Sequence, residues 1–112
     1  MCLFCKIVKK EVPAKVLFED DDVLAFHDIN PGAPTHVLVI PKRHVVSLNE
    51  VGAADAELLG KLVIAGRRVA EETKIAESGY RVVFNTGPHA GQSVFHVHMH
   101  VLGGRALSWP PG

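Results

Sequence analysis

The sequence predicts an α+β domain, an antiparallel sheet with a long helix on one face. Short runs of β-branched and aromatic residues lie toward both ends of the chain, and one long amphipathic segment lies between them. Strands, then a helix, then more strands is an order typical of this class. A chain of 112 residues most simply forms a single domain, residues 1–112.

The first half of the chain predicts a hairpin, a loop and a third strand. Residues 15–18, KVLF, and residues 23–27, VLAFH, flank the hydrophilic turn EDDD and predict the hairpin. Residues 28–34 are dense in turn formers, which predicts the loop. HVLVI, residues 36–40, is strongly β-branched and ends at Pro41, which predicts the third strand.

The second half predicts a helix over residues 54–77 and two further strands. Apolar residues recur there at helical spacing, and charged residues fall mainly on the other side. The apolar positions are Leu58, Leu59, Leu62, Val63, Gly66, Val69 and Ala70. The strands are expected over residues 80–85 and 94–102, joined by a glycine-rich loop.

Composition and charge argue against several classes of partner. The 12 basic and 12 acidic residues cancel, which leaves no electrostatic case for a nucleic acid or an anionic membrane as the main partner. No apolar run approaches the ~20 residues of a membrane span, and the N-terminal MCLFCKIVKKE lacks the order of a secretory signal. We therefore expect a cytoplasmic protein, in which Cys2 and Cys5 are thiols or metal ligands rather than a structural disulfide.

The stretch VFHVHMHVLGG, residues 94–104, places His96, His98 and His100 at every second position. Alternation along a strand predicts that the three imidazoles share one face. The residues expected in the core on the other face are Phe95, Val97, Met99 and Val101. A solvent-facing stripe, a metal site and a catalytic site are the three interpretations. The stripe is the least favoured, because surface stripes normally use Lys, Glu, Thr and Ser.

The preceding loop, NTGPHAGQS at residues 85–93, favours phosphate chemistry. Gly87 and Gly91 allow main-chain N–H groups to approach an anion closely. The same glycines would also serve a plain hairpin turn. Because the loop directly precedes the row of imidazoles, we favour an anion-binding role.

These segments resemble the histidine triad (HIT) family. HVHMH followed by an apolar residue has the family's His-x-His-x-His-x-x form. Residues 18–44, residues 79–105 and the terminal WPPG, residues 109–112, resemble the Hint branch, whose members are nucleoside phosphoramidase-like. The resemblance covers essentially the whole chain. It implies a five-stranded antiparallel sheet with one long and one short helix, and a homodimer in which the two sheets become continuous.

The resemblance also implies a reaction. The expected activity is that of an adenosine 5′-monophosphoramidase, hydrolysing the bond between the α-phosphate of AMP or GMP and an amine or acyl group. His98 matches the nucleophile that forms a covalent nucleotidyl-histidine intermediate, with its second nitrogen bonded to the main-chain carbonyl of His96. His100 matches a phosphate contact, Ser93 a residue near the leaving group, and His36 a further active-site histidine. A dinucleoside polyphosphate hydrolase and a nucleotide-binding regulatory module with incidental activity remain alternatives.

The nucleotide contacts follow from the same resemblance. Asp28 matches the carboxylate that takes both ribose hydroxyls, a role suited to two acceptor oxygens; from the residues alone it could equally cap the following loop. The other matched positions for phosphate, ribose and purine are Phe4, Ile7, Phe26, His27, Ile29, Leu38, Asn85, Gly91, Gln92, Ser93, Val94, His98 and His100. Trp109, the chain's one tryptophan, matches a tail that reaches the partner subunit's active site.

Cys2 and Cys5 have the spacing of a metal knuckle or of a redox pair. In similar bacterial HIT proteins the ligand set is completed by the histidine after a Pro-Lys pair and by the first triad histidine, here His44 and His96. These four residues suit a structural zinc ion, but family members that end in WPPG often bind none, so both outcomes stay open. The chemistry itself requires no cofactor, because four protein ligands leave the metal no open position.

Overall fold

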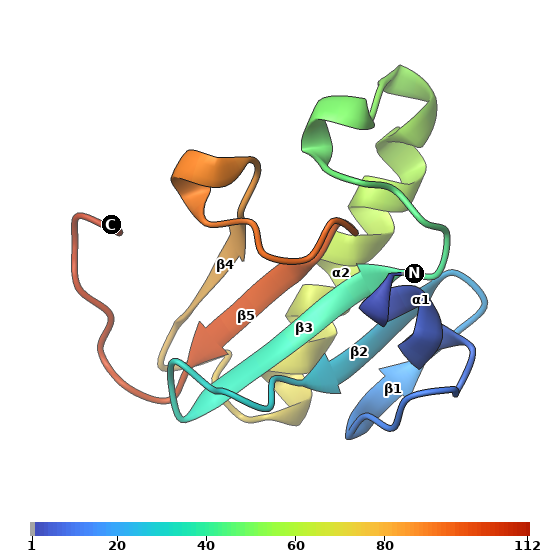
Figure 1. The fold of residues 1–112 in the computed structure, drawn as a ribbon. Helices are drawn as coiled ribbons and strands as arrows, with labels where there is room; N and C mark the ends of the chain where they lie inside the picture. Colours follow the sequence, from blue (N-terminus) through green and yellow to red (C-terminus); the bar gives the residue numbers. More distant parts are fainter. Residues whose placement is uncertain (1) are drawn as a thin grey trace.

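A five-stranded antiparallel sheet organises the chain (Figure 1). The computed structural model describes residues 2–112. The strands, in the sheet order β1-β2-β3-β5-β4, are β1 (Val16–Glu19), β2 (Val23–His27), β3 (Thr35–Pro41), β5 (Met99–Gly103) and β4 (Tyr80–Phe84). The helices are α1 (Leu3–Val8) and α2 (Ala56–Glu72), with 3-10 turns at Leu48–Glu50, Ala53–Asp55 and Pro88–Ala90. The predicted α+β class is confirmed, and within the described residues neither helix is long and apolar enough to cross a membrane.

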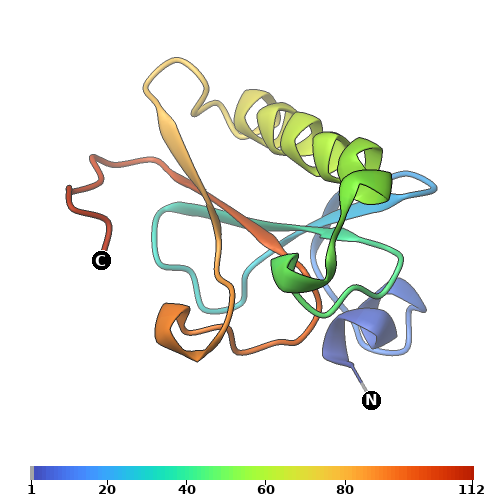
Figure 2. The ribbon, with the colours of Figure 1, turned by 90° about the horizontal axis from the view of Figure 1, so that it is seen from above.

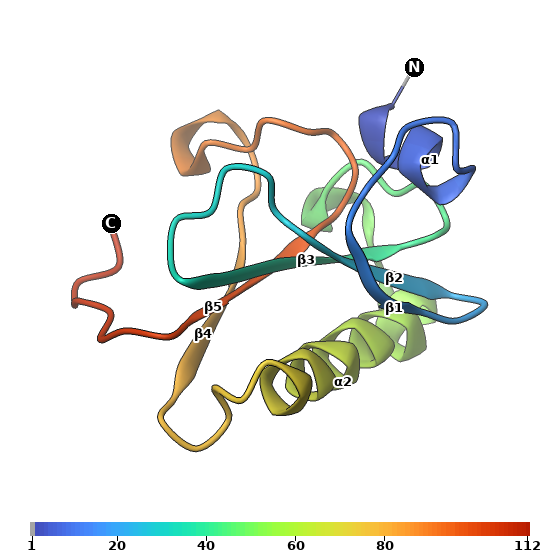
Figure 3. The same cartoon turned by 90° about the horizontal axis from the view of Figure 1, so that it is seen from below.

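The long helix α2 covers one face of the sheet, as Figures 2 and 3 show. Its buried residues are Leu62, Ala65, Gly66, Val69 and Ala70. Gly66 is required by a close approach, since a Cβ there would lie 2.3 Å from Cε of Met99 on β5. The helix therefore packs directly over β5, the strand that carries His100, and it buries Met99 and Val101 completely.

The short helix α1 covers part of the opposite face (Figure 3). Phe4 and Ile7 of α1 pack there against Leu24, Phe26, Leu38 and Ile40 of the two neighbouring strands. A helix of six residues has little stability of its own, so these contacts hold it in place. Because β2 and β3 are covered on both faces, nearly all their residues are buried.

The helix prediction is right in kind and wrong at its ends. The chain leaves α2 after Glu72 rather than continuing to residue 77, and Lys74 takes a left-handed φ of 63°. This turn brings Ile75 back against the core, where 4% of it is exposed. Val63 was predicted on the apolar side, but it is 55% exposed because it lies at the edge of the buried stripe.

The strand predicted over residues 94–102 is also shorter than expected. β4 ends at Phe84, opposite Met99, and the pairing with β3 also stops at Val39 and Met99, although β3 itself continues to Pro41. The preceding segment instead bonds to the chain that follows β3, where the N–H of Val97 donates to the carbonyl of Val45 at 2.7 Å. The core prediction is confirmed for Val97, Met99 and Val101, but it is wrong for Phe95, which is 62% exposed.

Candidate active site and metal centre

A cleft of about 310 Å³ lies between α1 and the end of the sheet. It brings together most of the residues that the sequence predicts for a nucleotide site. Those lining it are Phe4, Ile7, Phe26, His27, Asp28, Ile29, Leu38, Ser93, Val94, His98 and His100. Three predicted contacts, Asn85, Gly91 and Gln92, are not part of its lining. One end is apolar and the other carries the imidazoles and a carboxylate.

Five lining residues were not predicted. They are Leu3, Val12, Pro13, Ala14 and Asn30. Residues 12–14 belong to the connection between α1 and β1, and they extend the apolar wall that Phe4 and Ile7 begin. No chemical pattern in the sequence marks such a connection as part of a site, since its residues matter only for the shape of the wall.

His98 presents one unprotonated ring nitrogen. Its Nδ1–H donates to the main-chain carbonyl of His96 at 2.8 Å, so in the neutral ring Nε2 carries the lone pair. The side chain is 6% exposed and borders the cleft. The ring of Phe4 lies edge-on against it, with centroids 5.1 Å apart. The predicted carbonyl contact is therefore present, and the imidazole is fixed on two sides.

His100 is held as a neutral donor by a chain of hydrogen bonds. The N–H of Gly32 donates to Nδ1 of His36 at 2.9 Å, which leaves the proton of the neutral His36 ring on Nε2. That nitrogen lies 2.7 Å from Nδ1 of His100 and donates to it. His100 therefore keeps its own proton on Nε2, an atom that is buried and has no hydrogen-bond partner among residues 2–112. A buried donor without an acceptor suggests a ligand acceptor.

Burial lowers the pKa of His100 to about 4, helped by the neighbouring imidazoles of His98 and His36 and opposed by the Asp28 carboxylate. Burial likewise lowers the pKa of His36, again against the effect of Asp28. At pH 7 the free protein thus offers a neutral N–H at His100 rather than a positive charge. A bound phosphate would raise the pKa of His100, because a nearby anion favours the charged imidazole.

Asp28 caps the loop after β2 and also borders the cleft. Its Oδ1 accepts a hydrogen bond from the N–H of Asn30 at 2.8 Å, which caps the loop after β2. Its Oδ2 lies 3.4 Å from Nε2 of His36, and the residue borders the cleft. The loop contact therefore orients the carboxylate and still leaves it facing the site.

Gln92 closes the glycine-rich loop. Its Oε1 accepts from the N–H of Gly87 at 3.0 Å, and its Nε2 donates to the carbonyls of Val46 at 2.8 Å and Val94 at 3.2 Å. The side chain is 9% exposed. With its amide engaged by the main chain, Gln92 positions the segment before His98 rather than facing the cleft.

The terminal tail leaves Trp109 uncovered. The indole is 79% exposed. Arg81 donates to the carbonyl of Ser108 at 3.0 Å, and its guanidinium carbon lies 5.8 Å from the indole centroid. The tail is thus attached near β4, on the side of the sheet away from α1 (Figure 1).

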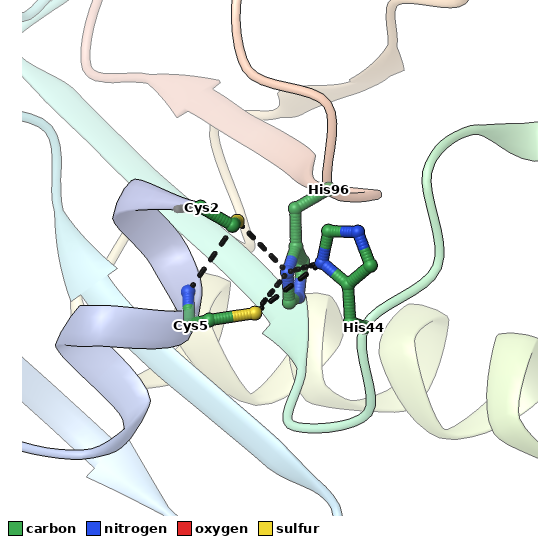
Figure 4. A group of neighbouring side chains, drawn as sticks. All are labelled: Cys2, Cys5, His44 and His96. Atoms are coloured by element: carbon green, nitrogen blue, oxygen red, sulfur yellow. Dashed lines mark hydrogen bonds between the residues drawn. The ribbon is translucent and has the colours of Figure 1, made fainter.

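A second cluster joins the start of α1 to the imidazole stretch. Figure 4 shows Cys2, Cys5, His44 and His96 converging on one point. Their ligand atoms all lie within 4.8 Å of one another. Nδ1 of His96 is 3.5 Å from Sγ of Cys2, 3.6 Å from Sγ of Cys5 and 3.2 Å from Nδ1 of His44. A tetrahedral zinc ion with ordinary bond lengths separates its ligands by about 3.3–3.8 Å, so the distances fit.

The protonation of His96 favours a cation over hydrogen bonds. Its Nε2–H donates to the carbonyl of Pro41 at 2.7 Å, so Nδ1 is the unprotonated nitrogen. One lone pair on Nδ1 cannot accept hydrogen bonds from three neighbours at once. A single ion among the four ligands satisfies all of them, and the bond to Pro41 is the outer contact that metal-bound histidines normally make.

The low pKa of His100 predicts a specific acid sensitivity. Between pH 6.5 and about 4 the unfolded chain binds a proton at this residue and the folded chain does not. Stability is therefore complete above pH 6.5 and falls as the pH drops toward 4. We expect the free energy of unfolding, measured in urea across this range, to fall less steeply in His100→Asn than in the wild type.

The exposed His89 provides the control, since His89→Asn is expected to keep the wild-type pH slope. The groups that face His100 are His36, His98 and Asp28, and both variants retain them. Protonation of the residues of the metal cluster affects the wild type and both variants alike, so it does not change the difference between their pH slopes. Equal slopes for wild type and His100→Asn would contradict the assignment.

Comparison with known proteins agrees with this geometry. A family model described as HIT domain matches residues 9–107. The purine nucleoside phosphoramidase of Escherichia coli K12 is 46% identical over 105 residues, which cover 94% of this chain and 88% of that protein. An uncharacterized HIT-like protein of Synechococcus elongatus is 49% identical, covering 98% of this chain and 96% of its own length.

Solved structures give the same result. A HIT family hydrolase from Legionella pneumophila Philadelphia 1 superimposes with a TM-score of 0.98 at 51% identity, covering 100% of both chains. A HIT family hydrolase from Clostridium thermocellum superimposes with a TM-score of 0.93 at 48% identity, covering 96% of this chain and 93% of the other. With the imidazole cleft, the family match and these relatives in agreement, the chain belongs to the HIT family.

Proposed function

We propose that the protein is a purine nucleotide-binding hydrolase that cleaves the P–N or acyl-phosphate bond of nucleoside 5′-phosphoramidates and their acyl analogues. The observation that carries the proposal is the unprotonated Nε2 of His98 at the cleft, next to the unpartnered Nε2–H of His100. A nucleophile and a donor for phosphoryl oxygen are the two groups that such a reaction needs. The likeness to the E. coli purine nucleoside phosphoramidase supports the same substrate class.

The reaction proceeds in two displacements. The lone pair of His98 Nε2 forms a bond to the α-phosphorus, and the P–N bond breaks with its electron pair on the amine, which takes up a proton. Water then attacks the same phosphorus and gives up a proton, which offsets the proton taken up by the amine; the P–Nε2 bond breaks, and its electron pair returns to His98. The products are AMP or GMP and the free amine. His100 donates to a phosphoryl oxygen as negative charge grows in each step.

The cleft suits one nucleoside. The apolar end, with Phe4, Phe26 and Leu38, would take the purine, and the two oxygens of Asp28 suit the ribose diol. Ligand pockets begin at roughly 300 Å³, and this cleft of about 310 Å³ is at that lower limit. It therefore favours a mononucleotide substrate over a dinucleoside polyphosphate. A pure binding module is the second alternative, but it would not need the orientation of His98.

The enzyme proposal predicts the effect of removing the nucleophile. We expect His98→Ala to lower kcat for an AMP phosphoramidate by at least about 1,000-fold, because the covalent path is lost. AMP affinity should stay within a fewfold, since one nucleophile contributes little to ground-state binding. Chromatography of the released AMP measures kcat, and calorimetry measures the affinity for AMP.

His89→Ala removes an exposed imidazole outside the cleft and is expected to behave as the wild type. Tight AMP binding without turnover in the wild type would favour the binding module. A large loss of affinity in His98→Ala would mean that this residue binds the nucleotide rather than attacking it.

We also propose that Cys2, Cys5, His44 and His96 hold a structural zinc ion. Two thiolates and two imidazoles form a ligand set that zinc prefers. The ion would tie α1 to the chain on either side of the cleft. Its effect on the reaction would be indirect, because α1 carries Phe4, whose ring contacts His98.

The zinc proposal predicts about one zinc ion per chain after dialysis of zinc-treated protein, measured by plasma mass spectrometry. Cys5→Ser should lose the ion and unfold at a temperature several degrees lower, because metal binding stabilises the folded state. His89→Ala, which lies outside the cluster, should retain it. Metal content near zero in the wild type would refute the site.

We further propose a homodimer formed at the β4 edge. β4 is a terminal strand of the sheet, and its Tyr80 and Val82 are 38% and 44% exposed. Val63 of α2 is 55% exposed on the same flank, since Gly66 one turn later packs on β5. An unpaired edge beside apolar side chains favours pairing with a second copy, which would make the two sheets continuous. The tail with Trp109 extends from this side toward the partner.

The dimer proposal predicts different effects at neighbouring positions of α2. Val63→Asp should convert the protein to a monomer, because the interface would bury a carboxylate without a partner. Ile64→Asp should leave the dimer intact, although Ile64 is 70% exposed, since it lies on the flank of Phe18 and Arg68 near β1. Light scattering after gel filtration gives the mass. A monomeric wild type, or a dimeric Val63→Asp, would contradict the interface.

A further inference from the structure

Arg105 lies outside the cleft, and we propose that it is a positioning residue that keeps the proton of His100 on Nε2. The arginine is exposed, and it belongs neither to the lining of the cleft nor to the metal cluster. It was not among the residues that the sequence predicted for the site. Its effect on the proton is independent of any reaction, whereas its effect on the rate rests on the proposed function.

The sheet brings Arg105 back to the loop that precedes β3. The end of β5 pairs with the start of β3. The residue after β5, Gly104, has a left-handed φ of 93°, and a Cβ there would lie only 2.8 Å from Cβ of Pro34. The chain after β5 therefore lies closely against the loop. From this position Nη2 of Arg105 donates to the carbonyl of Gly32 at 2.9 Å.

Two main-chain carbonyls hold the guanidinium group of Arg105. Besides the bond from Nη2 to Gly32, Nη1 donates to the carbonyl of Ala106 at 3.0 Å. A rigid planar group that bonds two acceptors is already oriented for both, and an ammonium group lacks this fork. The loop is therefore held at Gly32 by a bond from outside the cleft, and lysine would replace that bond only in part.

Gly32 in turn selects the proton arrangement of two histidines. The 2.7 Å contact between Nε2 of His36 and Nδ1 of His100 can carry its proton on either nitrogen when both rings are neutral. If His36 is the donor, Nε2 of His100 keeps a proton; if His100 is the donor, its Nε2 has a lone pair. The N–H of Gly32 lies 2.9 Å from Nδ1 of His36. Because Nδ1 must accept from it, the first arrangement is favoured.

Only the first arrangement suits a phosphate group. A phosphoryl oxygen can accept from the Nε2–H of His100, but in the second arrangement it would meet a lone pair. Asp28 also favours the first arrangement, because its Oδ2 lies 3.4 Å from Nε2 of His36. Loss of Arg105 would therefore loosen the loop and populate the second arrangement in part. Affinity for phosphate would fall with the fraction of molecules that keep the first.

Nitrogen-15 NMR spectra of the imidazoles test the proton positions without any substrate. They distinguish a ring nitrogen with a proton from one with a lone pair, and loss of signals in His36→Asn and His100→Asn assigns the two rings. At pH 7 we expect both rings of the wild type to be protonated on Nε2. Arg105→Ala should shift both toward Nδ1–H, and Arg105→Lys should shift them less. Signals unchanged in Arg105→Ala would overturn the proposal.

Two control variants should keep the wild-type signals. Arg68→Ala removes another exposed arginine, which pairs with Glu72 on α2, across the sheet from α1 (Figure 3). Gly32→Ala retains the N–H, and its Cβ would lie 3.7 Å from Nδ1 of His36, which is an ordinary contact. A shift in Arg68→Ala equal to that in Arg105→Ala would contradict a specific role for Arg105.

Ligand binding separates this role from a general disturbance of the loop, which also carries Asp28. AMP has the phosphate that His100 would bind, and adenosine lacks it. We expect Arg105→Ala to weaken AMP about twofold to tenfold, according to the fraction that keeps the first arrangement, and to leave the Kd of adenosine nearly unchanged. Equal weakening of both ligands would mean that Arg105 only supports the loop, and it would contradict the proposal.

A double-mutant cycle connects Arg105 with the reaction. Arg105→Ala should lower kcat/KM for an AMP phosphoramidate about twofold to tenfold in the wild type. It should have no further effect in His36→Asn, where the ring between Gly32 and His100 is missing. The same loss in both backgrounds would overturn the proposal. If the wild type hydrolyses nothing, the proposed reaction fails, and the nitrogen spectra still decide on Arg105.

Discussion

The contact between Gly66 of α2 and Met99 of β5 is the constraint on which the site depends. The absent Cβ lets the helix lie close enough to bury Met99 completely. With Met99 fixed on the helix side, alternation directs His98 and His100 away from the helix. α1 and the cleft are on that opposite side (Figure 3). Packing on one face of the sheet thus determines which groups meet a ligand on the other.

Much of the fold was predictable because its signals are local. The hairpin before residue 28, the strand ending at Pro41 and the long helix each have a periodicity that the structure confirms. The start of the strand that follows His98 could not be predicted in this way. Alternation of apolar residues and histidines continues through residues 94–98, but β4 ends opposite Met99 and the pairing with β3 stops at the same residue. The limit of β5 is therefore set by partners far away in sequence, and Phe95 is exposed for the same reason.

The candidate site was predictable to a similar degree. His98, His100, Asp28 and the aromatic wall were identified and lie at the cleft. Gln92 was expected to face a ligand, but its amide bonds three main-chain groups of the loop and its surroundings. A side chain that can bind phosphate can equally close a loop, and its type alone does not distinguish the two. The wall at residues 12–14 had no chemical signature because it contributes shape.

Main-chain groups orient the imidazoles of His98, His96 and His36, and the side chain of His36 in turn orients His100. Carbonyls of His96 and Pro41 accept from His98 and His96, and the amide of Gly32 donates to His36. The carbonyls are present whatever residue occupies a position, and the Gly32 N–H is lost only to proline, so mutation of a side chain that lines the cleft leaves these anchors in place. Natural variation can therefore change the side chains that line the cleft, while the ring nitrogens that carry the imidazole protons stay the same. A protein with this fold can therefore change the ligand it prefers without first changing the orientation of its reactive histidines.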